Sequence, residues 1–156
     1  MKRLAAALPL ALALALLSAP AAALEPPAND ETAIKQTALD YIEGWYEGNA
    51  ERMERALHPD LAKRAVFPNP ATGRDRFDHM SAMSLVQGTR SGFGKRTPKD
   101  KQQKDVTILD RFGSTASVKI VAADWIDYLH VAKINGRWLI VNVLWELKPK
   151  VDDKSK

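Results

Sequence analysis

The chain has 156 residues, of which 46% are hydrophobic, and a formal net charge of +4. Its length is typical of one domain with one hydrophobic core. It contains no cysteine, which excludes disulfide bonds, thiol catalysis and thiolate metal sites.

The first residues have the pattern of a secretory signal peptide. Lys2 and Arg3 precede an apolar run over 4–17, and small residues follow up to Ala23. We expect cleavage after Ala23 and a secreted or periplasmic mature chain. The apolar run is shorter than the roughly 20 residues of a membrane helix, so no stable membrane insertion is expected after cleavage. Without Lys2 and Arg3 the chain has 21 basic and 19 acidic residues, a balance that gives no argument for a nucleic-acid partner.

Beyond the signal peptide (1–23) and a flexible lead-in (24–29), we predict a single domain over 30–148 and a charged tail over 149–156. Asn29 or Asp30 can cap a first helix, and Gly48 ends it. The apolar stripe of this helix at helical spacing is Ile34, Ala38, Tyr41, Ile42 and Trp45.

The middle of the chain has weaker patterns. Asn49 can cap a short second helix that ends at His58, because the residue before a proline avoids helical angles. A strand is predicted over 61–67, and a third helix over 81–87. The polar, basic stretch over 88–104 is predicted to be a mobile connection.

The last third of the chain predicts four strands in antiparallel succession. Strands over 105–112 and 115–123 flank a turn, and a hairpin follows over 125–146 around Asn135-Gly136, a pair typical of a type I′ turn. Early helices and late strands predict an α+β fold with helices on one face of a curved sheet.

The hairpin is apolar on both faces. The turn predicts that Tyr128 lies opposite Val143 and that His130 lies opposite Val141. Helices can cover one face, so we expect the other face to form a homodimer. The expected interface residues are Tyr128, His130, Val141, Val143 and Trp145.

Two stretches, GWYEGNAERMERALHPDLAKR and DYLHVAKINGRWLIVNVLW, resemble the putative lumazine-binding family of the nuclear transport factor 2-like (NTF2-like) superfamily. The resemblance covers about 31–145. It implies a cone-shaped fold in which three N-terminal helices pack on a strongly curved antiparallel sheet and enclose a cavity, commonly in homodimers. The superfamily includes ketosteroid isomerase-like, dehydratase-like and polyketide cyclase-like proteins and members that only bind, so the fold leaves the activity open.

The candidate ligand-binding residues combine aromatic and polar side chains: Tyr41, Trp45, Asp127, Trp138 and Asn142. Asn142 offers hydrogen-bond donors and an acceptor. Asp127 is a candidate general base, because an apolar cavity raises the pKa of a carboxylate; the bland alternative is a surface carboxylate paired with Arg or Lys. His130 is the second catalytic candidate, but strand alternation puts it on the opposite face from Asp127.

The three histidines are scattered and form no metal-binding pair, so no metal and no cofactor are expected. We therefore predict an exported domain that binds a small aromatic or heterocyclic molecule in an apolar cavity. One alternative is a small-molecule isomerase or dehydratase/cyclase-like enzyme, and another is a structural dimeric subunit without ligand.

Overall fold

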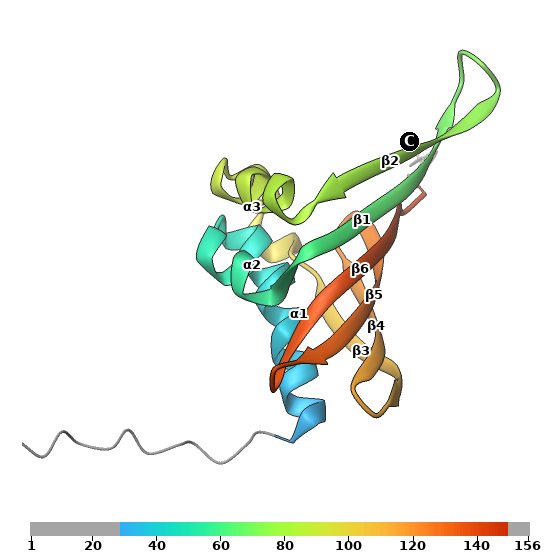
Figure 1. The fold of residues 1–156 in the computed structure, drawn as a ribbon. Helices are drawn as coiled ribbons and strands as arrows, with labels where there is room; N and C mark the ends of the chain where they lie inside the picture. The colour runs from blue at the N-terminus through green and yellow to red at the C-terminus, as the bar shows by residue number, and fades with distance from the viewer. Residues whose placement is uncertain (1–28, 150–156) are drawn as a thin grey trace, which may run out of the picture.

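A computed structural model describes residues 29–149 (Figure 1). The predicted signal peptide, most of the lead-in and most of the tail lie outside the described residues. Three helices pack against a curved, open six-stranded sheet, which confirms the α+β class. The helices are α1 (Asp30–Glu47), α2 (Ala50–Ala56) and α3 (Ala82–Arg90). The strands are β1 (Leu57–Asn69), β2 (Arg74–Ser81), β3 (Lys104–Phe112), β4 (Thr115–Ala122), β5 (Trp125–Ile134) and β6 (Arg137–Leu147). Within 29–149, no helix is long and apolar enough to cross a membrane.

Helix α1 begins and ends where its sequence predicts. The Asn29 side chain accepts a hydrogen bond from the Thr32 backbone N–H at 2.8 Å, and Gly48 ends the helix in the left-handed conformation (φ 65°). The Asn49 side chain caps α2 in the same way by accepting from the Arg52 N–H at 3.0 Å. These caps fix where α1 begins and ends and where α2 begins.

The sheet order is β2-β1-β6-β5-β4-β3. Strands β3 to β6 form the predicted antiparallel succession, and β1 joins it by parallel pairing with β6. The interior position of β1 was not expected from its weak pattern. It places β1 between β2 and β6, where α3 packs against it.

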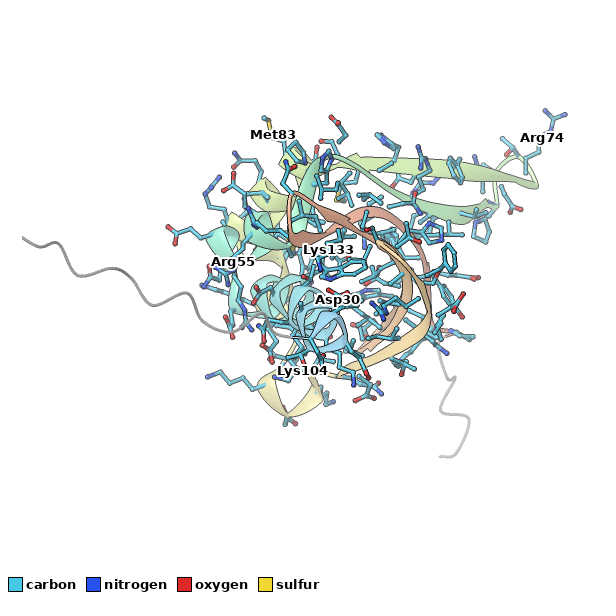
Figure 2. All side chains as sticks on the ribbon, turned by 60° about the horizontal axis from the view of Figure 1, so that its bottom comes forward. Asp30, Arg55, Arg74, Met83, Lys104 and Lys133 are labelled. Atoms are coloured by element: carbon cyan, nitrogen blue, oxygen red, sulfur yellow. The ribbon has the colours of Figure 1, made fainter. Side chains whose placement is uncertain are left out.

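Strand β2 was not predicted. It pairs with β1 over Ala62 to Asn69, and the two form a long arm that projects beyond the rest of the sheet (Figure 1). Most of its residues are exposed, so it lacks the apolar alternation that marks a half-buried strand. Figure 2 shows Arg74 at the tip of this arm.

A β-bulge in β6 corrects the predicted hairpin register. The turn forms as expected, with positive φ at Asn135 (51°) and Gly136 (80°). His130, however, pairs with Asn142 rather than Val141, because the register shifts between His130 and Val131. One extra residue on β6 reverses every later side chain on that strand.

The reversal changes the faces of four residues on β6. Val143 and Trp145 turn toward the helices, where Val143 is fully buried and Trp145 packs against the core. Asn142 and Leu144 turn to the outer face and pair with His130 and Tyr128. The expected outer positions of Val143 and Trp145, and the expected cavity position of Asn142, are therefore wrong.

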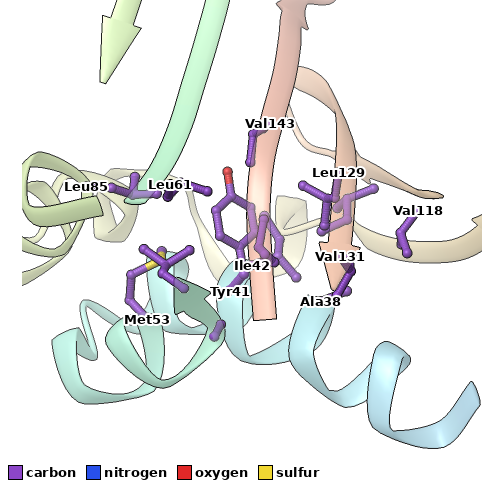
Figure 3. Packing of buried hydrophobic residues seen from close by; sticks show 14 of the residues in the cluster. Ala38, Tyr41, Ile42, Met53, Leu61, Leu85, Val118, Leu129, Val131 and Val143 are labelled. Atoms are coloured by element: carbon purple, nitrogen blue, oxygen red, sulfur yellow. The ribbon is translucent and has the colours of Figure 1, made fainter. Parts of the chain in front are cut away.

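The core lies between α1 and the inner face of the sheet. Figure 3 shows Tyr41 and Ile42 of α1 facing Val143, Leu129 and Val131 of the central strands. Ile34, Ala38 and Ile42 of the predicted stripe have no exposed surface. This packing fixes the end of α1 that carries Tyr41 and Trp45.

The segment over 88–104 is more regular than predicted. Helix α3 continues to Arg90, and two short 3-10 helices follow: η1 (Phe93–Arg96) and η2 (Lys99–Lys101). The short η1 packs against α1, which brings its side chains to the pocket described next.

Candidate functional site

A pocket of about 360 Å³ opens between the C-terminal half of α1, the inner face of the sheet and η1. Its volume lies at the lower end of the range for small-molecule sites, roughly 300–1,000 Å³. Its apolar and aromatic lining consists of Tyr41, Trp45, Met80, Leu85, Phe93, Trp125, Trp145 and Leu147. Its polar lining consists of Lys63, Arg96, Thr97 and Asp124.

A glycine lets η1 pack closely on α1 beside the pocket. A Cβ placed on Gly94 would lie 2.1 Å from the backbone oxygen of Trp45, so a larger residue could not approach α1 this closely. The contact brings Phe93 and Arg96, both exposed, to the pocket lining, with the Arg96 guanidinium 5.1 Å from the Phe93 ring. This part of the lining therefore carries an aromatic ring and a cation.

A buried group of polar side chains, which we name the Asp127 cluster, forms one wall of the pocket. It consists of Tyr41, Lys63, Trp125 and Asp127. The Lys63 ammonium donates to Asp127 Oδ1 at 2.7 Å and to the Tyr41 hydroxyl at 2.6 Å. Asp127 Oδ2 accepts from the Trp125 indole N–H at 2.7 Å and from the Tyr41 hydroxyl at 3.3 Å. Asp127 is 0% exposed and Lys63 only 6%.

Two aromatic rings lie close to the Lys63 ammonium. Its Nζ lies 4.9 Å from the ring centroid of Trp145 and 5.3 Å from that of Tyr41, distances at which cation–π attraction acts. Burial lowers the pKa of the Lys63 ammonium, and the negative charge of Asp127 opposes that shift. Burial raises the pKa of Tyr41 well above 10.0, and the charge of Asp127 adds to the effect.

The cluster presents a hydrogen-bond donor to the pocket. An ammonium has three N–H groups, and within the described residues the contacts to Asp127 and Tyr41 occupy two of them. The remaining N–H can donate to a ligand oxygen. Asp127 already accepts three hydrogen bonds, which suits a fixed counter-ion. Its role as a general base stays a prediction.

The structure brings together three of the predicted ligand-binding residues. Tyr41 and Trp45 line the pocket, and Asp127 lies directly behind Lys63 and Trp125. Trp145, expected at a dimer surface, lines the pocket because the bulge turns it inward. Asp124 also lines it.

The other predicted residues lie elsewhere. Trp138 lies near the opposite end of α1, where its indole N–H donates to Asp30 Oδ1 at 3.0 Å. Asn142 lies on the outer face and accepts from Arg64 Nη1 at 3.1 Å. His130 lies beside Asn142 on that face and, as expected, opposite to Asp127.

Lys63 was missed by the sequence analysis. Lysine is seldom buried without a partner, and its partner Asp127 is 64 residues away along the chain. The alternation of Leu61, Lys63 and Ala65 in β1 is the one local signal, because two apolar residues on the same strand face point inward. No group of three or more potential metal ligands occurs between Asn29 and Pro149.

A family model described as "Putative lumazine-binding" matches residues 29–146. This match runs from α1 into β6 and includes every lining residue of the pocket except Leu147. A comparison with curated proteins found no match.

Solved structures share the fold at low sequence identity. An NTF2-like protein of unknown function from Shewanella baltica has a TM-score of 0.60 and 18% identity over 77% of this chain and 94% of that one. An NTF2-like protein of unknown function from Methylobacillus flagellatus has a TM-score of 0.60 and 20% identity over 78% and 94%. A ketosteroid isomerase-like protein from Erwinia carotovora atroseptica has a TM-score of 0.50 and 14% identity over 78% and 100%.

Proposed function

The chain belongs to the putative lumazine-binding family, and from this premise we propose that it binds a small, flat aromatic or heterocyclic molecule in the pocket beside Lys63. The name of the family supports a small, flat heterocycle as ligand. The pocket supports the same class, since aromatic rings from α1, η1, β5 and β6 line it.

The observation that carries this proposal is the position of Lys63. Burying an ion pair costs desolvation free energy, and replacing such a pair with apolar residues is often neutral or stabilising. A buried ammonium at the wall of an aromatic pocket is therefore better explained by a ligand oxygen than by stability. A flat ligand would pack against Trp45, Trp125 or Trp145 and accept one charge-assisted hydrogen bond from Lys63.

A thermal-shift experiment tests the proposal on the mature protein. A ligand that binds the native state raises the melting temperature, and its stabilisation grows with the logarithm of its concentration over its dissociation constant. We expect lumazine to raise the melting temperature. Cyclohexanol, which has a hydroxyl group but no flat ring, should produce a much smaller shift.

Filling the pocket provides the control. Thr97 is half-buried in the pocket lining, so Thr97→Trp should occupy the cavity and abolish the lumazine shift. Thr107 is exposed on β3, outside the pocket, and Thr107→Trp should leave the shift intact. An equal lumazine shift in wild type and Thr97→Trp would contradict binding at this site.

We also propose a homodimer through the outer face of the sheet. Val66, Phe77, Tyr128 and Leu144 are exposed there, and the pairs Val66–Phe77 and Tyr128–Leu144 join them across four neighbouring strands. A second copy of the chain is the proposed partner, because two-fold symmetry places the apolar stripe of one copy against the same stripe of the other. Arg64 and Glu146 lie on the same face, so each copy offers both charge signs to the other.

Light scattering of point variants tests the dimer. Leu144 is 48% exposed on the outer face, and Leu109 is 51% exposed on the edge strand β3, which makes it a matched control. We expect wild type and Leu109→Lys to be dimers and Leu144→Lys to be a monomer. A monomeric wild type at micromolar concentration would contradict the proposal.

Export is a further proposal, supported by Lys2, Arg3 and the apolar run over 4–17. Mass spectrometry of the extracytoplasmic protein should find an N-terminus near Leu24. A protein that keeps Met1 and stays in the cytoplasm would contradict it.

A further inference from the structure

We infer that Lys63 is a nucleophile that captures flat aromatic aldehydes or ketones in the pocket as an imine. This inference rests on the proposed function, because the carbonyl compound must enter the same aromatic pocket. It adds a covalent step to that function and narrows the ligand class to molecules with a carbonyl group next to a flat ring.

The geometry holds the amine at the pocket wall. Lys63 lies on β1, which is paired on both sides, with Met80 of β2 and with Val143 of β6. Its Nζ lies close to the rings of Tyr41 and Trp145, and both rings line the pocket. A flat carbonyl compound packed against Trp145 would therefore place its carbonyl carbon close to Nζ.

The neighbours of Lys63 can move the required protons. Asp127 Oδ1, at 2.7 Å, accepts one proton from the ammonium and leaves a neutral amine with a lone pair. The burial of Lys63 favours this transfer, since it lowers the pKa of the ammonium. Tyr41 keeps its phenolic proton because its pKa is raised, and its hydroxyl lies 2.6 Å from Nζ.

The reaction then balances without another reactant. The amine nitrogen attacks the carbonyl carbon, the C–N bond forms, and an N–H proton passes through the Tyr41 hydroxyl to the former carbonyl oxygen. The resulting carbinolamine loses its hydroxyl as water after accepting the proton held by Asp127. The products are a protonated imine on Lys63, one water molecule and the Asp127 carboxylate. The positive charge stays beside Asp127, so the buried ion pair is conserved.

The same molecule provides a matched lysine without these features. Lys133 Nζ donates to Asp30 Oδ1 at 2.7 Å, the distance found between Lys63 and Asp127. The Lys133 side chain is 37% exposed, however, against 7% for that of Lys63, and it lies outside the aromatic pocket. Figure 2 shows Lys133 close to Asp30 at the start of α1. A difference in reactivity would therefore reflect the pocket rather than the ion pair.

Reductive trapping tests the inference. The full mature protein is incubated with limiting 2-naphthaldehyde and sodium cyanoborohydride, which reduces an imine to a stable amine, and is then digested for mass spectrometry. We expect Lys63 to be the main labelled residue and Lys133 to stay at background. Excess 2-naphthalenemethanol, which has the same shape without a carbonyl, should suppress labelling of Lys63 and leave that of Lys133 unchanged. This competition uses wild type, so it does not depend on the folding of a variant.

The variant Lys63→Arg keeps a positive charge beside Asp127 but forms no imine. It should lose the adduct in the pocket while other lysines react as before. If lumazine or 2-naphthalenemethanol raises the melting temperature of wild type and Lys63 is not labelled above Lys133, the inference fails and the proposed function stands. If neither compound shifts the melting temperature and Lys63 is unlabelled, both fail.

Discussion

Asp127 and Asp30 each accept hydrogen bonds from one lysine, one tryptophan indole and one further donor. The donors are Lys63, Trp125 and Tyr41 around Asp127, and Lys133, Trp138 and Arg111 around Asp30. Asp127 is inaccessible to solvent, whereas the Asp30 side chain is 29% exposed. We name the second group the Asp30 cluster.

The two clusters carry out different tasks. The Asp30 cluster ties the first turn of α1 to β3, β5 and β6. The positive end of the α1 dipole also stabilises the Asp30 carboxylate. The Asp127 cluster lies at the wall of the pocket and costs desolvation free energy. Similar donors around a carboxylate therefore fasten a helix where water is present, and under the proposed function they present a cation to a ligand where water is excluded.

Removing each carboxylate should give the largest contrast. Asp127→Asn leaves the Lys63 ammonium buried without a counter-ion and should lower the free energy of unfolding by about 3–5 kcal/mol. Asp30→Asn leaves Lys133 and Arg111 able to be hydrated, so its effect should be much smaller. Urea unfolding measures both, and equal losses would remove the distinction between the clusters.

Exchanging both ionic partners for apolar residues sharpens the same contrast. Lys63→Met with Asp127→Leu should be more stable than Asp127→Leu alone, with a coupling free energy of about 1–3 kcal/mol. Lys133→Met and Asp30→Leu should be nearly additive, because solvent screens that pair. A double-mutant cycle for each pair gives the coupling, and a null value at Lys63–Asp127 would contradict the buried pair.

The clusters should respond to pH at opposite ends of the scale. Burial lowers the pKa of Lys63 in the folded state below its ordinary 10.5. At a pH between the folded-state pKa and 10.5, Lys63 is protonated in the unfolded chain and neutral in the folded protein. The free energy of unfolding relative to Lys63→Met should therefore rise with pH. The hydrogen bond from Lys133, followed by that from Trp138, lowers the pKa of Asp30 below 3.8. Its stabilisation is complete above pH 3.8 and is lost as the pH falls through the folded-state value.

Urea unfolding at a series of pH values gives the free energy of unfolding of each protein. Subtracting the value for Lys63→Met from that of wild type isolates the contribution of Lys63, and subtracting that for Asp30→Asn isolates the contribution of Asp30. Tyr41 also titrates at high pH and acts in the opposite direction, since its pKa is raised in the folded state. Tyr41 is present in both wild type and Lys63→Met, so the subtraction largely removes its contribution. An alkaline difference that falls with pH would contradict the lowered pKa of Lys63.

The smallest effect should come from a residue outside both clusters. Asn142 is half-buried on the outer face, and its partner Arg64 is accessible to water. Asn142→Leu should change the free energy of unfolding by only about 0.5 kcal/mol and leave ligand binding unchanged. Loss of lumazine binding in this variant would reinstate Asn142 as a pocket residue and contradict the bulged register.

Much of the frame was predictable because its signals are local. The caps at Asn29 and Asn49, the end of α1 at Gly48 and the Asn135-Gly136 turn are set by residues next to one another. The bulge was not predictable, because residues 139–141 and 143–145 are all apolar and fit either face. Without a break in the alternation, one added residue leaves no trace in the sequence.

The candidate site was predictable only in part. Tyr41 and Trp45 follow from helical spacing, and Asp127 follows from its apolar surroundings on β5. The position of Lys63 in the site depends on the parallel pairing of β1 with β6, two strands that are far apart in the sequence. The role of Gly94 depends on the close approach of η1 to α1. The polar and basic residues next to it in the sequence do not indicate that packing.

The central claim is that Lys63 of the Asp127 cluster contacts the ligand and that Lys133 of the Asp30 cluster does not. A fluorescence titration of lumazine tests it with the two apolar exchanges, Lys63→Met with Asp127→Leu and Lys133→Met with Asp30→Leu, against wild type. A lost charge-assisted hydrogen bond of about 1.5–3 kcal/mol should weaken binding by about tenfold or more in the first variant and leave the second unchanged. Equal affinity in all three proteins, or weakening confined to the Lys133 variant, would contradict the account.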